Sequence, residues 1–188
     1  MREPAEREEI RKDVILQKCF DCIIEHGVEK VSIRIFSDAT GLTSSSLYYW
    51  FNDKDEIILD ATEYCVDSVV DKLFGYAMEN VKNVKKMCAE FPDMVKKYES
   101  TLKAIFQIAT SPQYGDRIIK LTNGFSSLYD LYAKKLSKHL NMPYEKIRQL
   151  VNLFISSIVD CVTWREWDKL SSEINFILSI ITNDGEER

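Results

Sequence analysis

A run of hydroxyl and phenol side chains, with no acidic or basic residue among them, is the first feature of this sequence that could do chemistry. The run contains Thr43, Ser44, Ser45, Ser46, Tyr48 and Tyr49. Short hydroxyls and phenols hydrogen-bond to phosphate oxygens and to base edges, and the lack of carboxylates permits close approach to a polyanion. The alternative is a solvated, serine-rich helix start, because serine runs are common outside binding sites. The residues alone leave both interpretations open.

Cysteine and histidine raise a second possibility, metal binding. Cys19 and Cys22 share one helical face, and His26 follows one turn later. Three ligands fall short of the four that a structural zinc takes, and both cysteines lie on an apolar stripe, so we interpret them as core residues. The sequence also lacks a glycine-rich phosphate loop, a nucleophile-elbow serine and a zinc-protease histidine pair. We therefore expect no catalytic residue, no metal and no cofactor, and we do not expect an enzyme.

Composition restricts the class of protein. The chain has 188 residues with only six Gly and four Pro, which favours long helices over an all-β sandwich. Its uncharged stretches are too short to cross a bilayer. The first residues are charged and polar, without the pattern of a secretory signal, and the five cysteines are then expected to be reduced thiols. We expect a cytoplasmic protein with no membrane partner.

The net charge of −5 is unevenly distributed along the chain. Residues 1–29 carry eight acidic and five basic side chains, and residues 55–60 carry three acidic ones and no basic one. Between them, residues 30–54 carry three basic and two acidic side chains and include the hydroxyl run. Local charge governs contact with phosphate, whereas total charge governs non-specific attraction. The charge therefore permits nucleic acid binding and predicts weak non-specific attraction.

The hydrophobic period is helical almost throughout and predicts an all-α fold of about nine helices. Gly27 is expected to end the first helix. Ser32 is expected to cap a short second helix, which Gly41 interrupts, and Thr43 or Ser44 to cap a third. A long fourth helix is expected at 54–79.

Three prolines divide the rest of the chain, and each is expected to start a helix at or just after it. They are Pro92, Pro112 and Pro143. The expected helical segments are 93–111, 114–141, 144–169 and 171–182.

The spacing within residues 32–51 fits a helix-turn-helix, in which two short helices cross at a steep angle. Ser37 is a small residue for the crossing, Gly41 suits a left-handed turn, and Leu47 can anchor the second helix. The run from Ile15 to Ile57 resembles the N-terminal domain of the tetracycline-repressor (TetR) family of bacterial transcriptional regulators. The matching segments are Ile15-Leu16, Cys19, Gly27, Val31-Ser32-Ile33-Arg34, Gly41-Leu42-Thr43, Leu47-Tyr48-Tyr49-Trp50-Phe51 and Lys54-Asp55-Glu56-Ile57.

The resemblance implies a DNA-binding domain at 8–54 and an effector-binding and dimerisation domain at 55–188. The hydroxyl run from Thr43 to Tyr49 would then line the recognition helix, with its serines near bases and Tyr48 at phosphate. Arg34 and Lys54 would hold the DNA backbone, the alternative for both being a solvated surface charge. Trp50 is interpreted, like Phe51, as a core residue.

The chain departs from the family pattern at several positions. Ser45 stands where the family usually has Gly or a similarly small residue, and Tyr49 where it often has His. Phe36-Ser37 replaces the usual Ile-Ala, which suggests a repacked core with the fold retained. The acidic flanks differ from the neutral to basic domains common in the family, and they lower the expected affinity for DNA.

The C-terminal segments 144–169 and 171–182 are too apolar to bury only one face each. A homodimer through about 144–182 is the preferred interpretation, and a thick monomer core is the alternative. The resemblance places an effector pocket among the preceding helices, where aromatic side chains suit such a lining. The alternative for each is a core residue, which is what an aromatic at helical spacing more often is. The candidates are Tyr64, Tyr98, Phe106, Phe125, Tyr129 and Trp164.

The sequence thus predicts a ligand-responsive regulator, most simply a repressor. It would bind a palindromic operator in double-stranded DNA as a homodimer and be released by a small-molecule effector. The alternative is an adaptor or co-regulator of the same fold that does not bind DNA directly. A small-molecule binding protein or an enzyme is a third, minor hypothesis.

Overall fold

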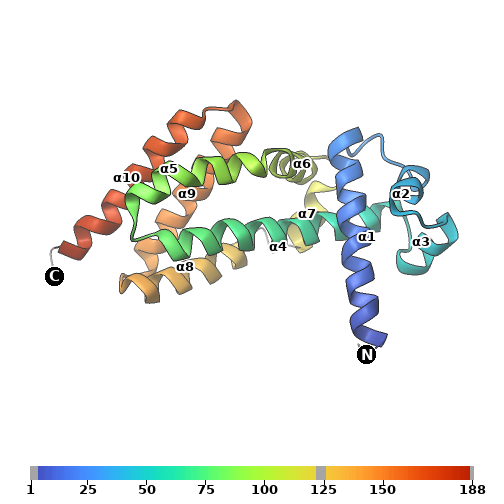
Figure 1. Cartoon of the computed structure of the whole chain (residues 1–188), viewed down its shortest axis with the longest axis horizontal. Coiled ribbons are helices and arrows are strands. Elements are labelled where there is room, and N and C mark those ends of the chain that lie inside the picture. Colours follow the sequence, from blue (N-terminus) through green and yellow to red (C-terminus); the bar gives the residue numbers. More distant parts are fainter. Residues whose placement is uncertain (1–3, 122–125, 187–188) are drawn as a thin grey trace. The chain divides into compact units, whose positions relative to one another are not determined.

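The computed structural model describes residues 4–121 and 126–186, with the side chains of 12–121 and 126–182. Within these ranges the chain forms ten helices and no strand, which confirms the all-α prediction (Figure 1). The expected segments 93–111 and 114–141 each correspond to two helices. The helices are α1 (Pro4–His26), α2 (Ile33–Thr40), α3 (Ser44–Trp50), α4 (Lys54–Asn80), α5 (Val84–Lys97), α6 (Glu99–Ala109), α7 (Gly115–Leu121), α8 (Ser126–Leu140), α9 (Tyr144–Trp164) and α10 (Trp167–Glu186).

Packing divides the chain into two compact units. The first unit combines Met1–Ser68 with Ala104–Leu121, and the second combines Val69–Lys103 with Thr122–Arg188. Both dividing lines fall inside helices, so α4 and α6 each contribute to both units. The expected boundary between 8–54 and 55–188 separates two functions and not two packing units, and it stays a prediction.

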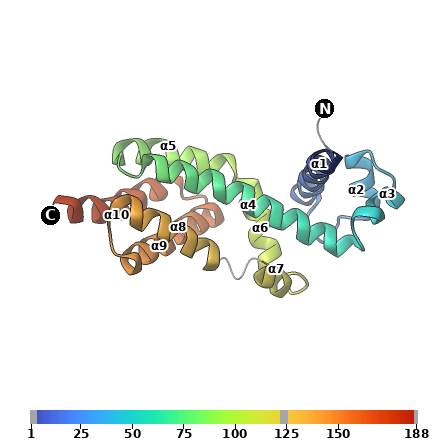
Figure 2. The same ribbon diagram turned by 90° about the horizontal axis from the view of Figure 1, so that it is seen from below.

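The turn between α2 and α3 is built from local hydrogen bonds. The Ser32 hydroxyl accepts from an amide in the first turn of α2, at 3.3 Å. Gly41 ends α2 with a left-handed backbone (φ 73°), and its N–H donates to the carbonyl oxygen of Ser37 at 2.9 Å. Thr43 caps α3 by accepting from the Ser46 amide at 3.1 Å. The expected caps and turn glycine are confirmed, and Figures 1 and 2 show α2 and α3 side by side.

The inward faces of the first three helices form the core of the first unit. Phe20, Phe36 and Leu47 are fully buried. Cys19 lies in the same core, where burial, together with the nearby Cys22, raises the pKa of its thiol to about 12. A thiol that stays protonated is a poor metal ligand and a poor nucleophile, which supports the interpretation of these cysteines as core residues. Over the part of the chain with described side chains, no group of His, Cys, Asp or Glu could hold a metal ion.

The second unit is built around α9, which packs against both α8 and α10, while α10 also packs against α5 (Figure 2). Aromatic rings join these helices to the second half of α4. The Phe74 ring stacks on Tyr132 with centroids 4.1 Å apart, and Phe154 lies 4.9 Å from Phe91. None of the described helices is both long and apolar enough to cross a membrane.

Pro92 does not start a helix as expected; it lies inside α5. A proline within a helix lacks the N–H that would reach the carbonyl four residues earlier, here that of Cys88. The hydroxyl of Ser171, on α10, donates to this Cys88 carbonyl oxygen at 3.2 Å. The partner that lets α5 continue through the proline thus comes from a helix about eighty residues further along the chain. Pro143, by contrast, stands directly before α9, as expected.

Replacement of Ser171 by alanine is expected to lower the free energy of unfolding by about 1 kcal/mol, because the half-buried Cys88 carbonyl then loses its donor. Urea denaturation followed by circular dichroism measures this change. The neighbouring Ser172 is exposed, so Ser172→Ala is the matched control, with an expected change below about 0.5 kcal/mol. Equal effects of the two substitutions would contradict this role for Ser171.

Candidate functional site

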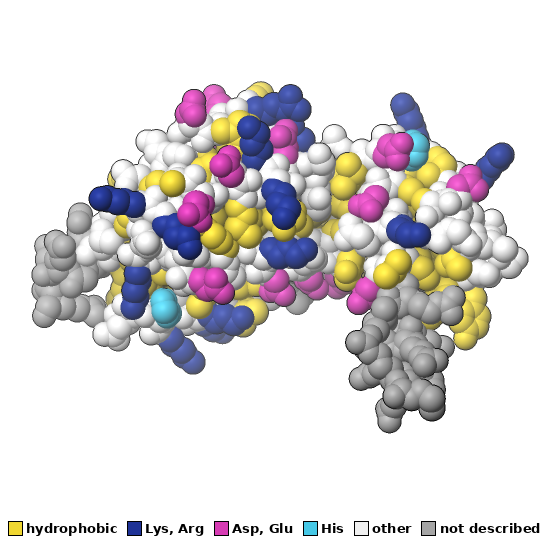
Figure 3. Space-filling view, viewed as in Figure 1, with side chains coloured by type: hydrophobic (Ala, Val, Ile, Leu, Met, Phe, Trp, Pro, Cys, Tyr) yellow, Lys and Arg dark blue, Asp and Glu magenta, His cyan; other side chains and the backbone are white. Residues whose placement is uncertain are grey.

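The outer surface of α3 consists of hydroxyl and phenol groups. The side chain of Tyr49 is 80% exposed and that of Tyr48 is 52% exposed, which is unusual for large aromatic residues. No charged residue occurs between Asp38 and Asp53. Figure 3 shows the surface over α3 as mostly white and yellow, the colours of uncharged polar and hydrophobic groups. This surface can approach an anionic partner closely without placing a carboxylate against it.

The four hydroxyls at the start of α3 differ in how they are used. Thr43 caps the helix and shares a hydrogen bond with the Ser46 hydroxyl at 2.9 Å. Ser44 shares one with Ser37 on α2 at 3.3 Å, which ties the two helices together. Ser45 is exposed and takes part in neither of these bonds. Three of these four hydroxyls therefore also maintain the local structure, and Ser45 is the most available of the four.

The two predicted phosphate-binding cations lie at the starts of helices. Arg34 is the second residue of α2 and is exposed, and Lys54 is the first residue of α4 and is half-buried. Each position lies next to amide groups that have no partner within the helix, which favours an anion nearby. The first turn of α4 is capped by the Asp53 carboxylate, which accepts from the Glu56 amide at 2.8 Å. Lys54 thus lies among carboxylates, which would reduce its predicted contribution to phosphate binding.

Asp55 connects the first turn of α4 to the segment around α7. The Tyr114 hydroxyl donates to one carboxylate oxygen of Asp55 at 2.9 Å, and the Arg117 guanidinium donates to the other at 3.2 Å. Tyr114 is almost completely buried, and burial together with its bond to Asp55 raises the pKa of its phenol. These contacts hold the helix start that carries Lys54. Sequence reasoning missed them because Asp55 and Tyr114 lie 59 residues apart.

Replacement of Tyr114 by phenylalanine is expected to lower the free energy of unfolding by about 1.5 kcal/mol, because it removes a buried hydrogen bond to a carboxylate and keeps the ring. Chemical denaturation measures the change. Tyr48→Phe is the matched control: its hydroxyl is on an exposed ring, so stability should be unchanged within about 0.5 kcal/mol. A Tyr114→Phe protein as stable as the control would show that the bond to Asp55 contributes nothing.

The six aromatic residues predicted to bind a ligand are spread over both units. Tyr64 and Phe106 lie in the first unit, and Tyr98, Tyr129 and Trp164 lie in the second. Phe125 lies outside the described residues. Tyr129 and Trp164 line one open hollow on α9, where the Arg148 guanidinium also stacks over the Tyr129 ring. The assignment of these residues to one effector site stays a prediction.

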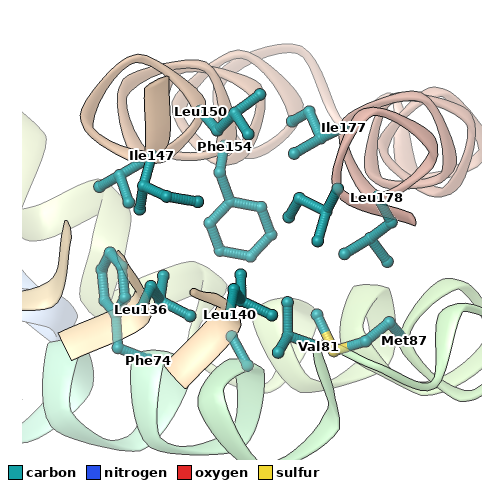
Figure 4. Close-up of a pocket in the computed structure, with 13 residues that line it drawn as sticks. Phe74, Val81, Met87, Leu136, Leu140, Ile147, Leu150, Phe154, Ile177 and Leu178 are labelled. Carbon is teal, nitrogen blue, oxygen red and sulfur yellow. The ribbon is translucent and has the colours of Figure 1, made fainter. Parts of the chain in front are cut away.

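A half-open apolar cavity lies elsewhere in the second unit, and none of those six aromatics lines it. Its volume is about 40 Å³, and side chains from five helices and from the turn after α4 line it. Figure 4 shows how these side chains face one another across the space. Sequence reasoning missed it because it searched for aromatic side chains, whereas this lining is mostly aliphatic. The sequence feature that could have pointed to the cavity was the excess of apolar residues in 144–169 and 171–182. The lining residues are Phe74, Ala77, Val81, Met87, Leu136, Leu140, Ile147, Leu150, Val151, Phe154, Ile177, Leu178 and Ile181.

The opposite side of α9 and part of α10 expose large apolar side chains. Trp164 is 69% exposed and Phe176 is 63% exposed, and Leu153 and Val159 are exposed as well. The same helix α9 buries another apolar row within the chain. The two apolar faces expected for this segment are therefore both present, one inside the chain and one on its surface. Exposed apolar surface of this kind commonly marks an interface.

Comparison with solved structures shows the same arrangement of helices in three bacterial and archaeal proteins. The structure of SCO7518 from Streptomyces coelicolor A3(2), described as a candidate transcriptional regulator, has a TM-score of 0.67 at 20% identity and covers 92% of this chain and 98% of that one. The fatty acid degradation regulator FadR from Bacillus halodurans has a TM-score of 0.61 at 17% identity, covering 96% of each chain. A TetR transcription regulator from Haloarcula marismortui ATCC 43049 has a TM-score of 0.62 at 13% identity, covering 93% and 96%.

In sequence, the chain is similar to the HTH-type transcriptional regulator PksA of Bacillus subtilis (strain 168), with 25% identity over 95 residues. The match covers 50% of this chain and spans about half, 46%, of the relative's length. No family model matches the chain.

The fold is that of an all-helical protein with an N-terminal helix-turn-helix and a helical second unit. It is the fold of TetR-type regulators, and the resemblance to the TetR family read from residues 15–57 is confirmed.

Proposed function

We propose that this protein is a DNA-binding transcriptional regulator that binds a palindromic operator as a homodimer and is released by a small-molecule effector. The observation that carries the proposal is the capped helix-turn-helix, whose second helix exposes hydroxyl and phenol groups and no charge. Side chains of this kind can enter a major groove and reach phosphates and base edges. The named relatives, which are described as transcriptional regulators, support the same function.

The homodimer is supported by the exposed apolar face of α9 and α10. A two-fold axis would pair this face with itself, burying Trp164 and Phe176 of both protomers. Two recognition helices related by such an axis can meet successive major grooves about 34 Å apart, which is the reason for a palindromic site. We expect the contacts between the two protomers to lie within about 144–182.

Release by an effector is supported by the continuity of α4. The first turn of this helix carries Lys54 and Asp55, and its later turns contribute Phe74 and Ala77 to the apolar cavity. A ligand that binds one position of α4 better than another shifts the population of DNA-binding conformations by its difference in affinity. Repression is then relieved by mass action of the effector.

A gel shift with the DNA that flanks the protein's own gene tests the proposal. If Arg34 and Lys54 each neutralise one phosphate in both protomers, log K should fall with log salt with a slope of about −3.6. Absence of binding to any of that DNA at low salt would overturn the proposal. Sedimentation of the free protein tests the homodimer separately.

An adaptor that does not bind DNA is the second candidate, and the carboxylates around Lys54 favour it. Replacing Tyr48 and Lys54 together by alanine distinguishes the two functions in cells. Loss of control of the target promoter supports direct DNA binding, because these side chains lie on the proposed DNA surface. Unchanged control, with the variant folded, supports the adaptor.

A further inference from the structure

The side chains that line the apolar cavity of the second unit differ in how exposed they are to solvent. Ala77, Met87 and Ile147 are buried at its wall, while Phe154 and Ile181 are half-buried and reach solvent. In Figure 4 the Phe154 ring projects from α9 into the space between the other side chains. The cavity is therefore closed on its inner side and bounded elsewhere by side chains that are partly exposed.

No polar group is available to a ligand in this space. All thirteen lining side chains are apolar. The ring of Tyr132 stacks on the lining residue Phe74, but its hydroxyl donates to Asp71 at 2.5 Å. No described buried side chain has an unpaired polar atom. A charged or hydrogen-bonding group placed here would lose its hydration without compensation, which makes its burial unfavourable.

The cavity is also unsuited to water and adaptable in shape. Its volume of about 40 Å³ exceeds what one water needs, but a bound water requires polar partners, and this lining has none. The volume is far below that of a pocket for a drug-sized ligand, so a ligand has to widen it. Met87 is unbranched and flexible, so it can adapt to a ligand, and Phe154 is only half-buried, although its ring also packs against Phe91. A narrow, linear molecule requires the least displacement.

From these observations we propose that the cavity binds a linear alkyl chain whose single polar head group stays in solvent beside Phe154 and Ile181. This inference rests on the proposed function, in which it names the chemical class of the effector. Insertion of the chain widens the space between the α4 residues Phe74 and Ala77 and the facing side chains of α9 and α10. The ligand thereby acts on the helix that begins at Lys54.

A series of primary alcohols from 1-butanol to 1-decanol tests the proposal on the full-length protein, with thermal unfolding as the measurement. A ligand that binds only the folded state raises Tm with concentration, which gives its affinity. Affinity should rise by about fourfold per added methylene and then level off when the cavity is filled. A diol such as 1,8-octanediol, which must bury its second hydroxyl, should bind at least about tenfold more weakly than 1-octanol.

Two matched pairs of variants locate the binding. Ala77→Leu fills the cavity and should weaken 1-octanol binding at least about tenfold, whereas Ala89→Leu, on the exposed side of α5, should leave it unchanged. If Ala77→Leu does not fold, Ile181→Asn at the half-buried edge replaces it. Its control is Ile180→Asn, which is also half-buried but does not line the cavity.

Equal alcohol binding by the cavity variant and its control, or no binding by any alcohol, would overturn the alkyl-chain proposal. A gel shift without alcohol is the independent readout for DNA binding. A protein that binds DNA but no alcohol refutes only the effector class. A protein that binds alcohol through the cavity but no DNA refutes only the proposed regulator.

Discussion

Replacement of Leu47 by alanine is expected to lower the free energy of unfolding by about 3 kcal/mol and to abolish DNA binding at moderate temperature. Leu47 is fully buried and is the inward anchor of α3, a helix of only seven residues. A helix this short is not stable by itself, so its position depends on packing against its neighbours. Loss of the anchor removes the buried apolar area and leaves a cavity behind it. Urea denaturation of the purified protein measures the change.

Leu131→Ala is the control for this experiment, because it makes the same chemical change on α8 at a side chain that is 46% exposed. Its expected cost is below about 1 kcal/mol. If Leu47→Ala were as stable as the control and still bound DNA, α3 would not be held by this residue. Hydrogen exchange of the α3 amides adds a local readout, and it should become much faster only in the Leu47 variant.

Replacement of Tyr49 by serine is expected to weaken binding to the operator by about a hundredfold, since both protomers of the proposed dimer would then lack the ring that we propose reads a base. Helix α3 contains no Arg, Lys, Asn or Gln, the residues that read bases through paired hydrogen bonds. Its most exposed large side chain is the Tyr49 ring, which lies edge-on against Trp50 with ring centroids 5.8 Å apart and is thereby oriented. An aromatic ring in the major groove reads thymine through its methyl group.

An operator in which uracil replaces the thymines at the Tyr49 positions tests this reading, because uracil differs only by the missing methyl. The wild-type protein should lose about fourfold in affinity per methyl, and about sixteenfold for a symmetric pair. The Tyr49→Ser protein should bind both operators equally. Tyr48→Phe is the control: it removes a hydroxyl that we expect to bond to phosphate, so it should weaken binding to both operators by the same factor. A thymine preference that survives in Tyr49→Ser would exclude Tyr49 as the reader.

Local structure was predictable where the determinants lie within a few residues of one another. The caps at Ser32 and Thr43 and the left-handed Gly41 follow from side chains that bond to the backbone of their own turn. Pro92 shows the limit of such reasoning. Its expected helix start fails because the carbonyl it leaves unpaired receives a hydrogen bond from Ser171, which no local pattern reveals.

The candidate site divides in the same way. The predicted DNA-facing residues form one short segment, and their exposure follows from the helical period once Leu47 is placed inside. The contacts that hold this segment come from Tyr114 and Arg117, far along the chain. The proposed ligand site was the least predictable part. Sequence reasoning selected aromatic residues, whereas the apolar cavity is lined mainly by aliphatic ones, most of them from five helices.

The hydroxyl run from Thr43 to Tyr49 was evident from the sequence itself, together with the helical period, the caps and the resemblance to the TetR family. These features are encoded by neighbours in the chain, whose geometry is fixed by the helix. Three features were decided by the tertiary structure alone. They are the hydrogen bonds from Tyr114 and Arg117 to Asp55, the continuation of helix α5 beyond Pro92, and the position of the apolar cavity. Each of these depends on which distant segments pack together, and a side chain's type does not specify its partner.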